Sequence, residues 1–255
     1  ASDVYKRQDK PYGKTGEYQI SGSGSKKYGY FEICSKESHA WYLATAYHWV
    51  SQIGFVNKFI NNRVNYITGA TGAGKSTQIP KLYTYYLKSI DKIADCTVML
   101  TVPRTNIATA GSSYVSEELA LPYKTYDING NEKKGEYLNN YNIQFKHMKD
   151  RHVKDGYFPK IKFITDGSVL KEARQPFNKM EYDTDGKSFT QKTKYNVIIV
   201  DEAHEHNDKM DLILTTIKTA SFYNNDMRFV IMSATMDADE PIYRRFYREI
   251  DDNRK

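Results

Sequence analysis

Short apolar runs alternate with amphipathic stretches along most of this 255-residue chain. The runs are bounded by polar or turn residues, as buried parallel strands are. Between them, apolar residues recur at the spacing of helices that pack on one side. This alternation predicts an α/β fold of three layers, in which a mostly parallel central sheet carries helices on both faces. The predicted strands are residues 64–68, 97–101, 161–165, 197–200 and 229–232.

Two helices are marked most clearly by their apolar positions. One ends before Pro122, and the other follows the fourth predicted strand. A third helix should begin near residue 75, but Pro80 lies inside it and, by the local rule, should kink or end it. The apolar positions of the first two helices are Ile107, Tyr114, Val115 and Leu119, and Met210, Ile213, Leu214 and Ile217.

The beginning of the chain does not follow this pattern. Residues 1–8 start without Met and resemble a non-native, adapter-like segment, and residues 9–44 are polar and predict an N-terminal extension or linker. The Ser- and Gly-rich stretch 21–27 fits either a flexible linker or a loop on an ordered extension. Residues 40–60 predict a helix packed on the domain that follows, which we place at 45–255. Within it, two polar stretches, 122–140 and 177–194, predict surface insertions whose lysines either contact a substrate or are simply solvated.

Composition narrows the class of protein only slightly. The net charge of +6 suits a polyanionic partner, although many basic proteins bind none. No apolar run reaches the roughly 18 residues that a membrane span needs, so we expect no membrane partner. The two cysteines, Cys34 and Cys96, form no CxxC pair, which predicts neither a zinc site nor a disulfide framework and favours an intracellular protein.

A phosphate-binding loop follows the first predicted strand and opens a helix. Residues 69–76 match G-x-x-x-x-G-K-[ST], in which glycines let successive backbone N–H groups face phosphate oxygens. Lys75 is expected to reach the β and γ phosphates of ATP, and Ser76 is expected to hold Mg²⁺. The predicted nucleotide-binding residues are Gly69, Ala70, Thr71, Gly72, Ala73, Gly74, Lys75, Ser76 and Thr77.

Two carboxylates close the fourth predicted strand. Asp201 is expected to hold Mg²⁺ together with Ser76, and Glu202, also a candidate metal ligand, is expected to deprotonate the water that attacks the γ phosphate. An Asp-Glu pair at a strand end is otherwise a common solvated turn. The phosphate-binding loop earlier in the chain favours the catalytic interpretation.

Residues 201–204 spell Asp-Glu-Ala-His, and with them the chain resembles a superfamily 2 helicase of the DEAH type. Four further blocks occur in the order of that family: residues 76–80, 101–105, 165–167 and 233–235. The resemblance implies the first RecA-like motor domain, a P-loop NTPase fold, and it includes Pro80 in the expected pattern.

The resemblance also implies roles for the remaining blocks. Residues of the second and third blocks grip the nucleic-acid backbone, and the last block couples hydrolysis to strand separation. His204, which alone could be an ordinary core histidine, becomes a catalytic residue beside Glu202 and Lys75. The implied nucleic-acid contacts are Arg104, Thr105, Thr165, Asp166 and Gly167, and the implied coupling residues are Ser233, Ala234 and Thr235.

The chain departs from the cellular members at His206, where they carry Arg, and in this it is more similar to helicases of poxviruses and other large DNA viruses. The expected setting is therefore intracellular: cytoplasm, nucleus, viral factory or virion. The expected partners are RNA, favoured over DNA, and a second RecA-like domain, whose arginine-rich block is absent from this sequence. We accordingly expect this chain alone to bind ATP weakly and hydrolyse it poorly. An ATPase that acts on DNA or remodels nucleoprotein, and a non-catalytic nucleic-acid-binding fragment, remain as alternatives.

Overall fold

A sheet of seven strands forms the centre of the computed structural model, which describes residues 17–19, 27–29, 47, 49–119, 121, 123–173, 178–182, 189–205, 207–235 and 239–252. The strand order is β3-β13-β12-β4-β9-β7-β8, and every neighbouring pair is parallel except β7 and β8. The predicted, mostly parallel α/β fold is confirmed. The strands are β3 (Val64–Thr68), β4 (Thr97–Val102), β7 (Ile143–Lys146), β8 (Arg151–His152), β9 (Lys160–Thr165), β12 (Val197–Val200) and β13 (Arg228–Ser233).

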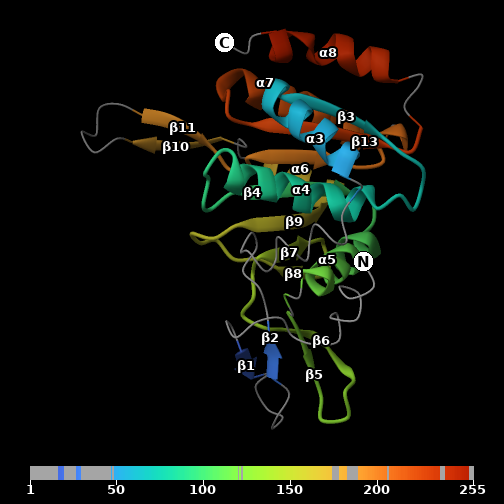
Figure 1. Ribbon diagram of the computed structural model, residues 1–255, viewed down its shortest axis with the longest axis vertical. Coiled ribbons are helices and arrows are strands. Elements are labelled where there is room, and N and C mark those ends of the chain that lie inside the picture. The colour runs from blue at the N-terminus through green and yellow to red at the C-terminus, as the bar shows by residue number, and fades with distance from the viewer. Residues whose placement is uncertain are drawn as a thin grey trace.

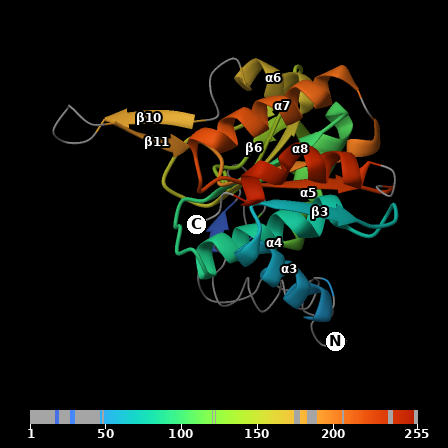
Figure 2. The same cartoon turned by 90° about the horizontal axis from the view of Figure 1, so that it is seen from above.

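Helices cover both faces of this sheet (Figure 1, Figure 2). Each face has its own apolar core, because successive residues of a strand point to opposite sides. In β9, Phe163 belongs to the first core and Ile164 to the second. Helices α3 (Trp49–Asn61), α4 (Lys75–Ser89) and α5 (Thr105–Glu118) contribute to the first core, and α6 (Asp166–Ala173), α7 (Asp208–Tyr223) and α8 (Glu240–Asp252) contribute to the second.

The clearest helix prediction is confirmed in α7, whose four apolar positions are buried. The prediction for α5 is right in its position but wrong in one residue, since Tyr114 is 52% exposed. Pro80 lies inside α4, which runs through it without ending, and the Thr84 hydroxyl donates a hydrogen bond to the Pro80 carbonyl. The expectation that Pro80 would kink or end the helix, which rested on the local rule, is therefore wrong in that the helix does not end there. The family pattern, which includes Pro80, is confirmed at this position.

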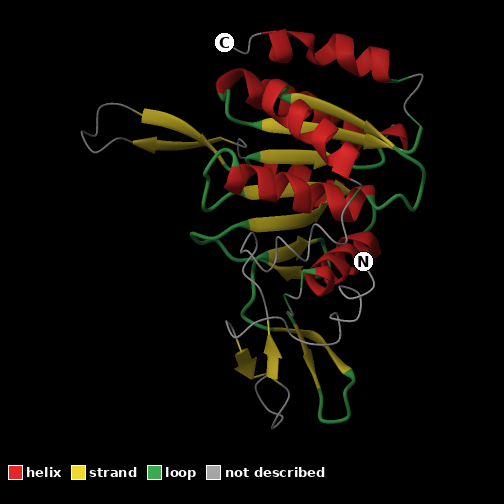
Figure 3. Ribbon diagram, viewed as in Figure 1, coloured by secondary structure: helices red, strands yellow, loops and turns green. Residues whose placement is uncertain are grey.

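Both predicted insertions contain a hairpin in their described residues (Figure 3). The first holds β5 (Lys124–Tyr126) and the mostly exposed β6 (Glu132–Tyr137). The second holds β10 (Asn178–Tyr182) and β11 (Phe189–Thr193), which pair only with each other and project away from the sheet (Figure 1). Near the start of the chain, β1 (Glu17–Gln19) pairs with β2 (Lys27–Gly29), while the rest of the predicted extension, including stretch 21–26, and residues 1–8 lie outside the described residues.

No helix in the described part of the chain is long and apolar enough to cross a membrane. Cys96 is a buried free thiol in the first core, and Cys34 lies outside the described residues.

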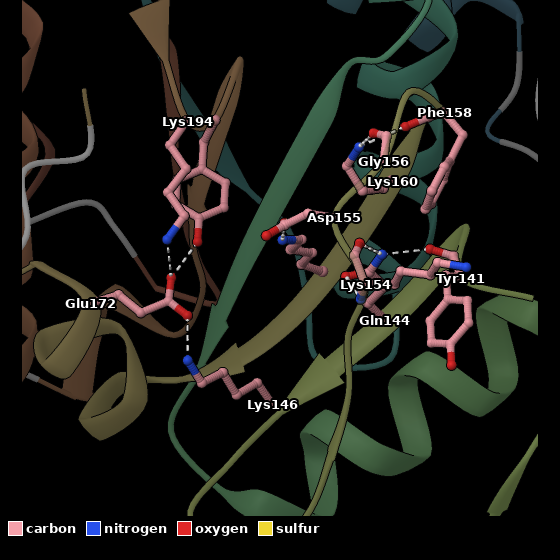
Figure 4. A network of polar contacts seen from close by, with 12 residues as sticks. Tyr141, Gln144, Lys146, Lys154, Asp155, Gly156, Phe158, Lys160, Glu172 and Lys194 are labelled. Carbon is pink, nitrogen blue, oxygen red and sulfur yellow. Dashed lines mark hydrogen bonds and ion pairs between the residues drawn. The ribbon is translucent and has the colours of Figure 1, made fainter. Parts of the chain in front are cut away.

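One carboxylate ties α6 to its neighbours. Glu172 accepts a hydrogen bond from Lys146 Nζ at 2.6 Å and from Lys194 Nζ at 3.2 Å, and the Tyr195 hydroxyl donates to it as well. Figure 4 shows the carboxylate between the two lysines. Burial alone would raise the pKa of Glu172, but the bonds from Lys146 and Tyr195 lower that pKa to about 2. The network joins α6 to the end of β7 and to the segment that enters β12.

We expect Glu172→Gln to lower the free energy of unfolding by roughly 3 kcal/mol at pH 7, because a depressed pKa measures how strongly the folded state favours the charged form. The contribution is present above the unfolded pKa near 4.5 and is lost as pH falls toward 2, so the difference from the native chain should shrink below pH 4.5. Urea unfolding of both chains at pH 7, 5 and 3.5 measures this difference in the free energy of unfolding. The exposed pair of Lys124 and Glu132 offers a control, since Glu132→Gln should cost about 1 kcal/mol or less. A difference that stays constant with pH would contradict this account.

Candidate nucleotide site and nucleic-acid interface

The predicted phosphate loop connects β3 to α4 and requires glycine at two positions. Gly72 has φ of 82° and Gly74 has φ of 75°, the left-handed region that side chains with a Cβ rarely adopt. Gly74 is also the N-cap of α4, and no side chain caps that helix end. No side chain therefore competes with a bound anion for the N–H groups at the start of this helix.

A glycine pair provides a test of this backbone. Gly74→Ala is expected to lower the free energy of unfolding by about 1–2 kcal/mol, because alanine is strained at this φ and its Cβ would lie 3.3 Å from Gln78 Cγ. Gly54, inside α3, has no atom within 4 Å of an added Cβ, and Gly54→Ala should raise stability by about 0.5–1 kcal/mol. Thermal unfolding of both variants compares them. Equal shifts of the same sign would contradict the strained-loop account.

Lys75 and Ser76 lie where the motif requires. Lys75 is 7% exposed, and its Nζ donates to the carbonyls of Gly69 at 2.5 Å and Ala70 at 3.1 Å, so the ammonium lies within the loop itself. The Ser76 hydroxyl donates to Asp201 Oδ2 at 2.5 Å, which joins the loop to the end of β12. The Thr77 hydroxyl donates to the Gly74 carbonyl at 3.1 Å and so joins the first turn of α4 to the last glycine of the loop.

The two carboxylates after β12 differ in environment. Asp201 is 2% exposed, and burial, with a further contribution from the charge of Glu202, raises its pKa to about 6 against the opposing bond from Ser76. Glu202 is partly exposed and has φ of 53°, one of two non-glycine residues in the described chain with positive φ. Such backbone costs about 1–3 kcal/mol and is concentrated at functional sites. The strained backbone at Glu202 therefore marks the end of β12 as a candidate functional position.

A chain of hydrogen bonds runs from the acidic box to the last predicted block. Ser233 Oγ donates to the Thr235 carbonyl at 2.8 Å, so it can only accept from His204 Nδ1 at 3.1 Å. The Nδ1 atom therefore carries the hydrogen, and it also lies 3.4 Å from Glu202 Oε2. The Ser233 carbonyl in turn accepts from the Gly69 amide at 3.3 Å. These contacts connect Glu202, His204, the coupling block and the phosphate loop, although Ala234 between Ser233 and Thr235 makes no polar side-chain contact.

The predicted nucleic-acid residues lie at one edge of the sheet. Val102 at the end of β4 is in register with Thr165 at the end of β9, so the N-termini of α5 and α6 are neighbours. Arg104 is exposed at the N-cap of α5, with no side chain capping that helix, and Thr105 opens the helix. This end of α5 presents a guanidinium and free N–H groups together.

The second predicted segment is less accessible. Thr165 and Asp166 are 6% and 4% exposed, and the Thr165 hydroxyl donates to Ser168 Oγ at 3.1 Å. Burial and the charge of Glu205 raise the pKa of Asp166. Gly167 has no atom within 4 Å of an added Cβ, so its backbone faces open space. Of this segment, the backbone at Gly167 is the part best placed to meet a strand.

One contact was not foreseen from the sequence: the bond between the Gly69 amide and the Ser233 carbonyl, which links two motifs that are distant along the chain. Backbone contacts between neighbouring parallel strands leave no side-chain signal. In the described part of the chain, no group of three or more His, Cys, Asp or Glu residues could hold a metal ion. The candidate metal site consists instead of the Ser76 hydroxyl and the Asp201 carboxylate, with Glu202 next to it. His206 lies outside the described residues.

Residues 46–238 match the protein family described as type III restriction enzyme, res subunit, or ResIII. A protein of Acanthamoeba polyphaga mimivirus named "Putative ATP-dependent RNA helicase R366" is 41% identical over 240 residues, covering 88% of this chain and 13% of that protein. Human DHX35, named as an ATP-dependent RNA helicase, is 32% identical over 184 residues, covering 72% of this chain and 21% of its own length. A pre-mRNA-splicing factor ATP-dependent RNA helicase of Schizosaccharomyces pombe is 33% identical over 180 residues, 70% of this chain and 22% of that protein. The chain thus spans less than a quarter of each of these relatives.

Proposed function

Because this chain belongs to the ResIII family and its relatives are named ATP-dependent RNA helicases, we propose that it is the ATP-binding motor domain of a nucleic-acid helicase that acts on RNA. The observation that carries the proposal is the hydrogen bond between Ser76 and Asp201, which joins the phosphate loop to the acidic box. The bond between His204 and Ser233 joins the acidic box to the coupling block. The mimivirus relative agrees with the viral resemblance noted at His206.

The phosphate loop fits the triphosphate of ATP. The uncapped N-terminus of α4 offers N–H groups and positive helix-dipole charge, and two positive-φ glycines keep the loop free of side chains. Lys75 Nζ is held by two loop carbonyls at the place where an anion would compete for it. On binding, Lys75 would exchange these neutral acceptors for charged phosphate oxygens, which form stronger bonds.

The oxygens of Ser76 and Asp201 fit Mg²⁺, a hard cation that prefers hydroxyl and carboxylate ligands. They lie 2.5 Å apart as donor and acceptor of one hydrogen bond, and Asp201 is buried with a raised pKa that a cation would lower. When bound, Mg²⁺ would neutralise charge on the β and γ phosphates. Glu202, the neighbouring residue, can bind Mg²⁺ through a water molecule.

Glu202 is the proposed general base. Its carboxylate is partly exposed and so can receive a proton from a water molecule on the phosphate side. His204 Nδ1 donates to Ser233 Oγ at 3.1 Å, and the same atom lies 3.4 Å from Glu202 Oε2, so the imidazole edge faces both residues. A change at the phosphate loop would reach the coupling block through Ser233, because its carbonyl accepts from Gly69.

The nucleic-acid strand would lie across the N-termini of α5 and α6. Arg104 can form charge-assisted bonds to a phosphate, and backbone donors can bind its neighbours without reading sequence. We further propose a second RecA-like domain as the partner that completes the cleft, with an arginine on the transferring phosphoryl group. The alternatives are a DNA-acting ATPase and a non-catalytic nucleic-acid-binding fragment. ATP turnover with added RNA or DNA, followed by duplex unwinding, separates these three possibilities in a polypeptide that contains this chain.

Arg104→Ala should weaken the binding of single-stranded RNA by about 10-fold. The loss of affinity should be the same for RNA of different base sequences, because a phosphate contact carries no base information. ATP affinity should stay unchanged. Fluorescence anisotropy with labelled oligouridylate and oligoadenylate measures the effect. Arg245, exposed on α8, provides the matched control, and Arg245→Ala should leave the affinity for RNA within about twofold. A loss confined to one base sequence would argue against a phosphate contact.

A further inference from the structure

A buried lysine lies on the second face of the sheet without a hydrogen-bond acceptor among the residues that the structure describes. Lys162, in the middle of β9, has a side chain only 9% exposed, and its Nζ donates no hydrogen bond to any group in the described part of the chain. The described carboxylate nearest to it, that of Asp155, is 3.8 Å away and fully exposed. A largely buried ammonium whose only described ion partner is 3.8 Å away and exposed is costly, and stability would favour an apolar residue here.

The direction of this side chain is set by the strand. Lys162 points to the same face as Ile164, which belongs to the second core, but next to it the core gives way to polar groups. The ring of Tyr195 lies 5.8 Å from the ammonium, and burial lowers the lysine's pKa. Its ion partner Asp155 is wholly exposed, so the ammonium pairs with a carboxylate at the surface of the domain.

Two further lysines belong to the same cluster. Lys194 and Lys146 share Glu172, and the Glu172 and Lys194 charges both influence Lys162. Figure 4 shows Lys146 and Lys194 on either side of Glu172, with Asp155 nearby. The three ammonium groups face two carboxylates, one of which is in solvent, so the cluster carries a positive excess. A phosphate group, which accepts several hydrogen bonds from point charges such as lysine, is the ligand that matches it.

The cluster adjoins the proposed nucleic-acid contacts at the N-terminus of α6. Lys146 at the end of β7 is in register with Ile164, the residue before Thr165, and Glu172 lies on α6, the helix that Asp166 begins. Resting on the proposed function, we propose that Lys162, Lys194 and Lys146 form a second phosphate site that binds the nucleic-acid strand where it leaves the N-terminus of α6. The site would lengthen the strand contact along the face of β9 and β7.

The test is binding of a labelled 12-nucleotide oligouridylate to the 255-residue chain over a series of salt concentrations. Lys162→Gln and Lys194→Gln should each weaken binding by about 3- to 10-fold and reduce the salt slope by about 0.7, the value for one released counterion on a single strand. Lys162→Gln should not unfold the chain, because it removes a desolvated charge, and its melting temperature checks this. Asp155→Asn should tighten binding by about twofold or more, since it removes the exposed competitor of the phosphate.

Lys58→Gln, on the exposed side of α3, is the matched control and should change neither affinity nor slope. Unchanged affinity and slope in Lys162→Gln and Lys194→Gln, together with weakened binding in Arg104→Ala, would overturn the second phosphate site and leave the proposed function standing. Failure of the native chain to bind any oligonucleotide would overturn both.

Discussion

Replacing Glu202 by glutamine is expected to lower ATP hydrolysis by about 10²- to 10⁴-fold while ATP binding stays within about threefold of the native value. The amide keeps the size of the side chain and its place at the strained backbone, but it cannot accept a proton from water. His204 Nδ1, which lies 3.4 Å from Glu202 Oε2, would still face a side-chain oxygen. Single-turnover hydrolysis, and equilibrium binding of a fluorescent ATP analogue, measure the two quantities in this chain and in a longer polypeptide that contains it.

Glu205 provides the control for Glu202. It lies three residues away in the short 3₁₀ helix η1 (Ala203–Glu205), and its side chain is exposed. Glu205→Gln should leave hydrolysis within about twofold, because a solvated carboxylate away from the phosphate loop does no proton transfer. Native-like turnover in Glu202→Gln would exclude this residue as the base and leave only a positioning role for His204.

Lys75→Ala should weaken ATP binding by about 10- to 100-fold, since each hydrogen bond between charged groups contributes roughly 1.5–3 kcal/mol. It should also change the loop itself, because the Gly69 and Ala70 carbonyls lose the ammonium that donates to them. Titration calorimetry measures the affinity, and the binding of AMP isolates the effect, since AMP has no β or γ phosphate for Lys75 to hold.

Lys88, at the opposite end of the same helix, is the control for Lys75. Lys88→Ala should leave ATP affinity within about twofold, because it lies several turns from the loop. An equal loss of AMP and ATP affinity in Lys75→Ala would show that the variant had damaged the loop as a whole. A selective loss of ATP affinity supports the phosphate contact.

Most of the sheet could be predicted because its central strands are fully buried. Every residue of β4, β9 and β12 is buried, so β12 is wholly apolar, β4 is mostly so, and β9 carries lysines at 160 and 162 among its apolar residues. The two strands that were not predicted, β7 and β8, lie at the edge. In β7 the polar Gln144 and Lys146 alternate with apolar residues, and β8 has only two residues. The C-terminal helix α8 was missed as well, because charged residues separate its buried residues Tyr243 and Tyr247 and obscure their helical spacing in the sequence.

The candidate site was predictable where chemistry depends on residue type within one motif. The loop, the acidic box and the order of the blocks could all be recognised from local sequence. The burial of each candidate side chain could not be predicted from the sequence, because it depends on which elements pack against the end of its strand. Arg104 is accessible as expected, whereas Thr165 and Asp166 are nearly covered, and Lys162 looked like an ordinary strand residue. The proposed roles of these residues in binding ATP, Mg²⁺ and RNA stay predictions.

The position of the β10–β11 hairpin has a practical use. It joins the end of α6 to the start of β12, and Asn196 beside it bonds to Thr97 at the beginning of β4, so the hairpin belongs to the edge opposite the phosphate loop. Its strands pair with nothing else in the described chain. A fluorophore or affinity tag inserted between β10 and β11 would therefore leave the phosphate loop and Arg104 untouched. Lys194 directly follows β11 at the base of the hairpin, so the far end, beyond Tyr182 and Phe189, is the preferred attachment point for single-molecule measurements.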